Sequence, residues 1–208
     1  VKGIRKDEIK IGDYVLKVKK GNPMEYLGKT VTAYVKEFEE YGEYELLSIV
    51  NVSFEKEYII DSDDDITWSK SSSNVISVKY YEDTKPRTLT IPSDAKYYYN
   101  GCLTSDYDTI ARGLNMTQGN IRVLKTQEGT YVFLNEYFDI IVSTIDKNNY
   151  VLRDSLVYGK IKIPVDDDSS YVGIHTDDGD VDFDGIKAGD ICSIFKSVDG
   201  TYFDIYIH

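Results

Sequence analysis

The side chains with the clearest potential for chemistry in this sequence are carboxylates, which gather in three runs. The runs comprise Asp61, Asp63, Asp64 and Asp65, then Asp166, Asp167 and Asp168, then Asp177, Asp178, Asp180, Asp182 and Asp184. Asp180, Asp182 and Asp184 match the first half of a calcium loop, in which alternate oxygen ligands converge on one hard cation. Position twelve of such a loop would be Ile191, where a bidentate glutamate is usual. We therefore keep two interpretations of this segment, a calcium site and a solvated acidic turn.

Hydrolytic chemistry is the next possibility for these acids. Glycoside hydrolysis needs one acid and one base or nucleophile at a fixed separation. Here the acids lie in turn-like segments, where water and mutual repulsion dominate and no apolar pocket is indicated that would raise one pKa. His175 and His208 are too few for a histidine metal triad, and they form no serine or cysteine triad signature. We therefore expect no catalytic activity and no cofactor, with calcium as the one candidate ligand.

Cysteine and aromatic residues supply the remaining candidates. Cys102 and Cys192 are too few for a disulfide framework, and whether they pair is left open. The chain has 19 tyrosines and a single tryptophan, Trp68, which either packs in the core or contacts a partner at the surface. Tyr97 and Tyr99 are further candidate surface contacts. Together with Trp68, these tyrosines would be the stacking platforms if the chain binds carbohydrate.

Charge and hydropathy narrow the class of partner. A formal net charge of −12 repels phosphate backbones, so we expect no nucleic-acid partner. No apolar run approaches the roughly 20 residues of a spanning helix, so we expect no membrane span. The chain opens at Val1 without a signal segment, and we expect a mature or excised piece of a longer series.

The elements that must position these residues are predicted to be strands. Alternation with a period of two recurs along the chain, for example over 75–81, 87–91, 121–125 and 160–164. Only two short helices are indicated, Pro23–Leu27 and Tyr107–Met116, the second with Asp106 as its cap. Asn100 and Gly101 predict a tight two-residue hairpin turn. The chain is therefore predicted to be all-β with one or two short helices.

A hairpin pattern appears three times and sets the predicted domain organisation. The copies start at Gly28, Gly119 and Gly189. Each copy consists of a strand, a turn that contains an acidic residue and a glycine, and a return strand that begins near a tyrosine. We divide the chain into three β-modules at residues 1–54, 55–138 and 139–208. Each module holds enough strands for a small β-barrel or a curled antiparallel sheet, similar in size to an OB or SH3 domain.

Several short sequence segments resemble those of a known class of protein. Ser93, Asp94, Ala95 and Lys96 lead to Tyr99, Asn100 and Gly101, while Gly189 and Asp190 lead to Lys196, Ser197, Asp199 and Gly200. In this order they resemble the non-catalytic β-rich repeat regions of clostridial-type surface proteins that carry S-layer homology domains. The resemblance implies an extracellular position on the bacterial cell surface or in the cell-wall layer.

These observations predict a non-catalytic structural or assembly module of an S-layer-associated surface protein. We expect its partners to be proteins, either further copies of the chain or neighbouring surface subunits, met through strand edges and tyrosine-bearing faces. One alternative is a structural component of a bacteriophage virion, in the tail or capsid. A further alternative is a carbohydrate-binding module.

Overall fold

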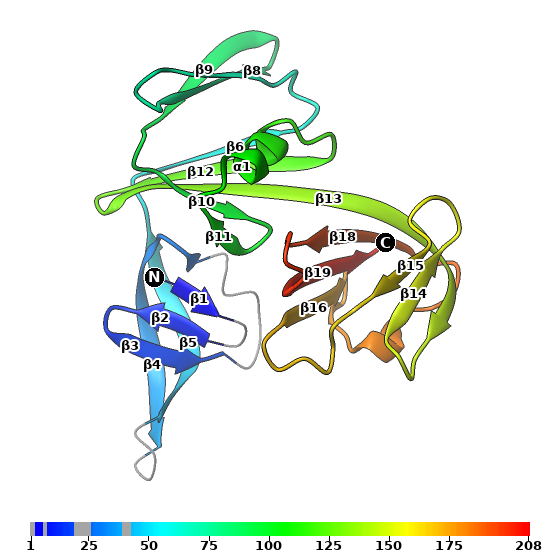
Figure 1. Ribbon diagram of the computed structural model, residues 1–208. Coiled ribbons are helices and arrows are strands. Elements are labelled where there is room, and N and C mark those ends of the chain that lie inside the picture. The colour runs from blue at the N-terminus through cyan, green and yellow to red at the C-terminus, as the bar shows by residue number, and fades with distance from the viewer. Residues whose placement is uncertain (1–2, 6–7, 19–25, 39–42) are drawn as a thin grey trace. The chain divides into compact units, whose positions relative to one another are not determined.

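The computed structural model describes residues 3–5, 8–18, 26–38 and 43–208, and these residues are mostly β-strand (Figure 1). The all-β prediction is confirmed. Of the two predicted forms, curled sheets are present, and the described strands close no barrel. Two compact units can be distinguished by their internal packing, one made of 1–27, 31–51 and 137–208 and the other of 28–30 and 52–136.

The N-terminal sheet belongs to the first unit and has the strand order β1-β2-β3-β5-β4. Its strands are β1 (Gly3–Arg5), β2 (Glu8–Ile11), β3 (Tyr14–Lys17), β4 (Thr30–Phe38) and β5 (Glu43–Ser53). Ile9 and Leu16 oppose each other on β2 and β3 and are both buried. Strands β4 and β5 are neighbours in this sheet, where a hairpin was predicted to start at Gly28. Their described side chains are exposed or half-buried, so these two strands contribute little to a core.

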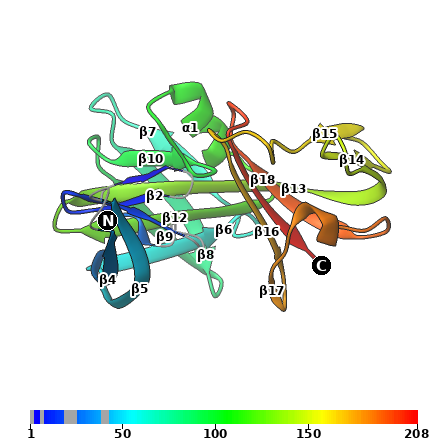
Figure 2. The ribbon, with the colours of Figure 1, turned by 90° about the horizontal axis from the view of Figure 1, so that it is seen from below.

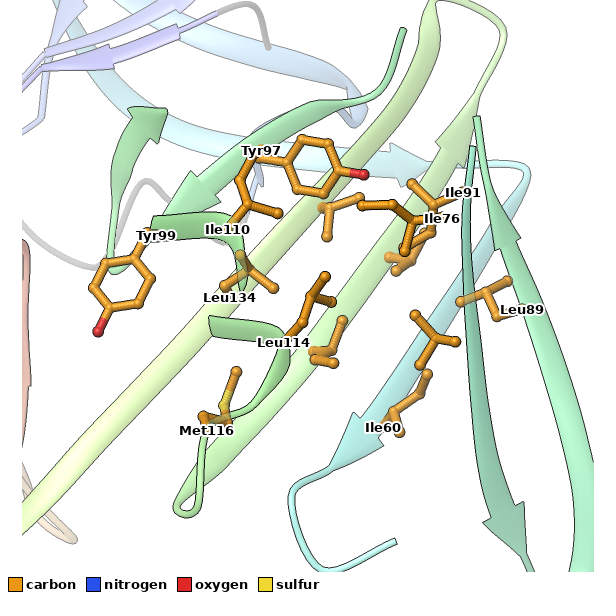
Figure 3. Packing of buried hydrophobic residues seen from close by; sticks show 14 residues of the cluster. Ile60, Ile76, Leu89, Ile91, Tyr97, Tyr99, Ile110, Leu114, Met116 and Leu134 are labelled. Carbon is orange, nitrogen blue, oxygen red and sulfur yellow. The ribbon is translucent and has the colours of Figure 1, made fainter. Parts of the chain in front are cut away.

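The second unit contains two sheets that enclose a hydrophobic core. One is the three-stranded meander β7-β8-β9, and the other joins β11, β10, the first part of β13, β12 and β6. Figure 3 shows the core between them, in which the ring of Tyr97 points toward the middle of the cluster. The bounds are β6 (Lys56–Asp61), β7 (Thr67–Lys70), β8 (Ile76–Glu82), β9 (Lys85–Ile91), β10 (Lys96–Tyr99), β11 (Cys102–Thr104), β12 (Gly119–Thr126) and β13 (Gly129–Asp146).

Two local predictions are confirmed in this unit. Helix α1 (Tyr107–Leu114) is capped by Asp106, whose carboxylate accepts a hydrogen bond from the Thr109 backbone N–H at 2.8 Å. Ile110 and Leu114 are one turn apart and both enter the core. Asn100 and Gly101 have φ angles of 40° and 80°, the left-handed pair that a tight hairpin turn between β10 and β11 requires.

The C-terminal sheet is built on the second part of β13, which is a long continuous strand in both views (Figures 1 and 2). From β13 the order continues through β18, β19, β16 and β17, while β14 and β15 form a hairpin on its other edge. The bounds are β14 (Val151–Asp154), β15 (Lys160–Lys162), β16 (Tyr171–Thr176), β17 (Gly179–Asp180), β18 (Ile191–Lys196) and β19 (Tyr202–Ile207), with a short 3-10 turn at Phe183–Gly185. A second core lies on its inner face, with Ile140, Cys192, Ile194, Phe203 and Ile205 among its members.

The hairpins predicted from Gly119 and Gly189 are both present, as β12–β13 and β18–β19. Three strand pairs, β3–β5, β10–β13 and β16–β19, are parallel, which the hairpin pattern did not predict. The division into three modules stays a prediction. Its second boundary, at residue 138, falls within the continuous strand β13 and close to the change of unit after Glu136. The predicted helix at Pro23–Leu27 lies, apart from its last two residues, outside the described part of the chain.

Candidate functional site

The prediction that Tyr97 and Tyr99 are surface contacts is wrong. Their exposed fractions are 8% and 2%, and both belong to the core of the second unit. The tyrosine between them, Tyr98, is also buried, because it stacks on Phe133 with ring centroids 5.4 Å apart. Both faces of β10 are therefore covered. Burial raises the pKa of Tyr97 to about 12, so its hydroxyl stays protonated in the folded protein.

Trp68 lies in β7, and its ring packs partly against the same core. Its indole N–H donates to the Asn115 side-chain oxygen at 3.0 Å, and its ring meets the Tyr107 ring edge-on. This placement agrees with a packing role. A surface contact through the part of the ring that remains accessible stays a prediction.

Asp180, Asp182 and Asp184 lie within five residues of chain, and two of them form ion pairs with different partners. Asp180 pairs with His175, and Asp184 pairs with Lys147 at 3.3 Å. Asp182 precedes the 3-10 turn and makes no capping hydrogen bond. No group of three metal-ligating side chains is found within the described ranges. The calcium site stays a prediction, and calorimetry or a thermal shift with millimolar calcium is its test.

Cys102 and Cys192 are not joined to each other by a disulfide. Cys192 is buried on the inner face of the C-terminal sheet, and burial raises the pKa of its thiol to about 12, with a smaller contribution from the charge of Asp190. Cys102 is half-buried on β11. A thiol with so high a pKa is a poor nucleophile at neutral pH, so Cys192 has a packing role.

The feature with the most potential for recognition is the face of the C-terminal sheet opposite its core. Because side chains alternate along a strand, the residues between the core positions point to this other side. We call it the outer face. It carries Tyr137, Asp139 and Ile141 on β13, Ile191, Ser193 and Phe195 on β18, Tyr202, Asp204 and Tyr206 on β19, and Tyr171, Gly173 and His175 on β16.

Aromatic rings connect the strands of the outer face. Tyr137 contacts Phe195 with centroids 5.3 Å apart, and Phe195 contacts Tyr206 edge-on at 5.7 Å. Tyr206 in turn contacts the His175 ring at 4.8 Å. A continuous row of rings therefore crosses β13, β18, β19 and β16. Such pairs contribute about 0.5–1.5 kcal/mol each beyond their burial, so the row is a rigid surface.

His175 lies between two carboxylates at the end of this row. Its Nδ1 is 2.7 Å from Asp180 and its Nε2 is 2.7 Å from Asp204. The hydrogen bond to Asp204, aided by the charges of both aspartates and opposed by burial, raises the pKa of His175 to about 9. The hydroxyls of Tyr202 and Tyr206 donate to the second oxygen of Asp204. At neutral pH this cluster therefore contains an imidazolium that compensates a buried carboxylate.

Gly173 makes room for this cluster. A Cβ atom at position 173 would lie 2.5 Å from an Asp204 carboxylate oxygen, 2.7 Å from the Tyr171 hydroxyl and 2.8 Å from His175 Nε2. The backbone of Gly173 does not have a positive φ, so the requirement for glycine is one of space. The polar side chains converge above a residue that has no side chain.

Ser193, His208 and Asp139 meet on the same face without forming a catalytic triad. The Ser193 hydroxyl donates to Asp139 at 2.6 Å and lies 2.8 Å from His208 Nε2. In a serine hydrolase the histidine stands between the serine and the acid, so that it can accept the proton and be oriented. Here the serine stands in the middle. This arrangement leaves the serine hydroxyl bound to a carboxylate and gives the histidine no acid partner.

Two aliphatic side chains extend the outer face at its edge. Ile141 and Ile191 are paired across β13 and β18, and both are exposed. Sequence reasoning missed the outer face because alternation marks two sides of a strand without saying which side is covered. The available signal was the pattern over 202–207, which puts Tyr202, Asp204 and Tyr206 on one side of β19 and the apolar Phe203, Ile205 and Ile207 on the other.

Comparison with known proteins finds no match to any family model, curated protein or solved structure. The resemblance to S-layer-associated repeat regions therefore stays a prediction. In the described part of the chain, no helix combines the length and apolar character needed to cross a membrane.

Proposed function

We propose that this chain is a non-catalytic structural module that self-associates, or joins neighbouring subunits, at a bacterial cell surface. The observation that carries the proposal is the outer face, which carries both a row of rings and the exposed pair Ile141 and Ile191. Aromatic side chains are enriched at protein interfaces, and contiguous exposed apolar surface marks interaction sites. A rigid sheet that presents such side chains binds with little loss of conformational entropy.

The chemistry of the outer face supports recognition over catalysis. The Ser193 hydroxyl is bound to a carboxylate, and His175 is committed to two aspartates. Neither group is poised to transfer a proton to a substrate. The same surface physics serves a virion subunit, and the genes beside the coding sequence would separate that alternative from a cell-surface protein.

The test is the effect of an outer-face charge on association. We expect Ile191→Lys to weaken concentration-dependent self-association by at least about tenfold, since interface-centre substitutions commonly cost more than 1 kcal/mol. Light scattering after size-exclusion chromatography and negative-stain microscopy give the readout. Leu103→Lys is the matched control, because Leu103 is an exposed aliphatic residue, 66% against 47% for Ile191, on strand β11 of the other unit. Equal association of both variants and the wild type would contradict a role of this face.

Carbohydrate binding is a second candidate, favoured by the same rings. Tyr206 is exposed and its ring contacts His175, whose partner Asp180 has a side chain that is 59% exposed, so a sugar ring can stack on Tyr206 while Asp180 accepts a hydrogen bond from its hydroxyls. A glycan array distinguishes the two candidates. Strong hits that Tyr206→Ala removes would favour carbohydrate, and a blank array together with ordered oligomers would favour assembly.

A further inference from the structure

The turn between β14 and β15, residues 155–159, presents aliphatic side chains to solvent. Leu156 is 72% exposed and Val157 is 81% exposed, more than any other large hydrophobic side chain described. Turns are ordinarily built from Gly, Pro, Asn, Asp and Ser, which suit both the backbone and water. Two adjacent aliphatic residues, which we call the tip, therefore need an explanation outside the turn itself.

The turn is held in one conformation. The Asp154 carboxylate accepts hydrogen bonds from the backbone N–H groups of Val157 at 2.7 Å and Tyr158 at 2.9 Å. The Asp154 backbone N–H donates to the Gly159 carbonyl at 2.8 Å, which closes the turn. The tip is therefore preorganised, which reduces the entropy lost on binding.

The turn lies directly beside the outer face. Ile141 belongs to that face, and its backbone N–H donates to the Asp154 carboxylate at 3.2 Å. Its carbonyl accepts hydrogen bonds from the backbone N–H and the hydroxyl of Ser155, each at 2.9 Å. On β18, Ile141 is paired with Ile191, and both side chains are exposed. The exposed tip and the exposed aliphatic pair of the outer face are therefore neighbours in one molecule.

The β14–β15 hairpin is positively charged in a chain whose formal net charge is −12. Residues 151–162 include three basic residues and one acidic residue, Asp154, whose carboxylate is turned toward the backbone of the turn. Arg153 and Lys160 are directly opposite each other beside the turn, and both are exposed. Arg153 also interacts with the charge of Asp146 on β13. A basic margin, with Lys160 as its main member, therefore borders the apolar tip.

The outer face has the opposite charge beside its aliphatic pair. Asp139 precedes Ile141 by two residues on β13, so both side chains point to the same side of the sheet. Asp139 is exposed, and one of its oxygens accepts the Ser193 hydroxyl at 2.6 Å. Farther along, His175 offsets one of the two aspartates that hold it, so the outer face together with Asp180 remains net negative. An acidic margin, with Asp139 as its nearest member, therefore borders the aliphatic pair.

The adjacency of these two surfaces selects a symmetry. The hydrogen bonds to the Ile141 backbone fix the start of the turn, so the tip cannot fold over onto the aliphatic pair of its own chain. A two-fold axis that passes between two neighbouring complementary surfaces places each of them on its counterpart in a second copy. Both contacts then form at once, and the assembly closes with two molecules.

We propose that two copies form a symmetric dimer in which the tip of each copy packs on Ile141 and Ile191 of the other. This inference rests on the proposed assembly function, and it names a second copy as the partner of the outer face. The basic margin of each copy meets the acidic margin of the other, which fixes the orientation of the pair. Each contact is made twice, so one substitution removes it at two places in the dimer.

The first experiment removes either half of the contact in the full chain. Leu156→Ser with Val157→Ser removes the tip, and Ile191→Lys places a charge in the aliphatic pair. We expect each change to raise the dissociation constant of the dimer by at least about tenfold in analytical ultracentrifugation. Leu103→Ser is the matched control, because Leu103 is 66% exposed on β11 of the other unit. Circular dichroism checks the fold of every variant.

The second experiment reverses the charges of the two margins. Lys160→Asp and Asp139→Lys should each weaken the dimer, because each places like charges against one another in both contacts. The variant that carries both changes should recover most of the wild-type affinity, because opposite charges meet again. A double variant that associates no better than the single variants overturns the proposed orientation.

The outcomes separate this contact from the assembly function. A tip variant that dimerises like the wild type overturns the contact, and if Ile191→Lys is then monomeric, association through the outer face stands. A wild type that forms open chains overturns the two-fold arrangement and leaves assembly in place. If neither the tip variant nor Ile191→Lys differs from the wild type, the contact and the role of the outer face fail together.

Discussion

Replacing His175 tests how much its charge contributes to the stability of the fold. The side chain is only 15% exposed and lies between Asp180 and Asp204, which together raise its pKa to about 9. His175→Gln removes the positive charge while keeping a side chain that can form hydrogen bonds. Asp204 would then be a buried carboxylate without its cation, an arrangement that destabilises a fold.

The magnitude and the pH window follow from the pKa of His175. The pKa of His175 is about 9 in the folded state and 6.5 in the unfolded chain, and this difference corresponds to a stabilisation of about 3 kcal/mol at most. Because the folded pKa is raised, this stabilisation is complete below about pH 6.5 and disappears as the pH rises through about 9. The free energy of unfolding of the wild type should therefore exceed that of His175→Gln by about 3 kcal/mol at the acidic end of the window. The difference should shrink toward the alkaline end.

Urea denaturation over a series of pH values measures this difference, with the NMR signals of β16 and β19 reporting on the C-terminal sheet. The control is Asp180→Asn, because the Asp180 carboxylate is 59% exposed and a pair with so open a partner contributes little. Parallel pH dependences in the wild type and His175→Gln would refute the reasoning. So would a direct NMR titration that places the midpoint of the His175 ring near 6.5.

Three further predictions concern packing and reactivity. Gly173→Ala should lower the free energy of unfolding by about 1–3 kcal/mol, because the added methyl group overlaps three polar atoms; a change below about 0.5 kcal/mol in urea denaturation would contradict this account. A thiol-specific reagent should label Cys102 first and Cys192 only on unfolding, since burial raises the pKa of Cys192 to about 12, and equal labelling rates would contradict its placement. Asn100→Ala should cost about 2–4 kcal/mol, because it breaks two hydrogen bonds to the Glu136 backbone and puts alanine at a φ of 40°, and thermal unfolding measures the loss.

The short-range features of this protein are determined by the sequence itself. Period-two alternation identified the strands because a pleated strand must divide its side chains between two faces. The cap at Asp106 located α1, and Asn100 with Gly101 located a turn, because in each case a few adjacent residues satisfy or permit a local backbone conformation. None of these inferences needs knowledge of a distant segment.

Which face of each strand is covered, and by which residues, was decided only by the tertiary structure. Tyr97, Tyr98 and Tyr99 are a run of identical residues that does not reveal which side of β10 is covered, and the structure covers both sides because β10 lies beside β13 within a packed unit. His175 and Asp204 are 29 residues apart and become neighbours through the parallel pairing of β16 with β19. Pairing between distant strands is selected by the burial of whole faces, and local residue types do not encode it. For that reason Asp180 could be named as a candidate ligand from the sequence, while its pairing with His175, and that of His175 with Asp204, depends on the fold.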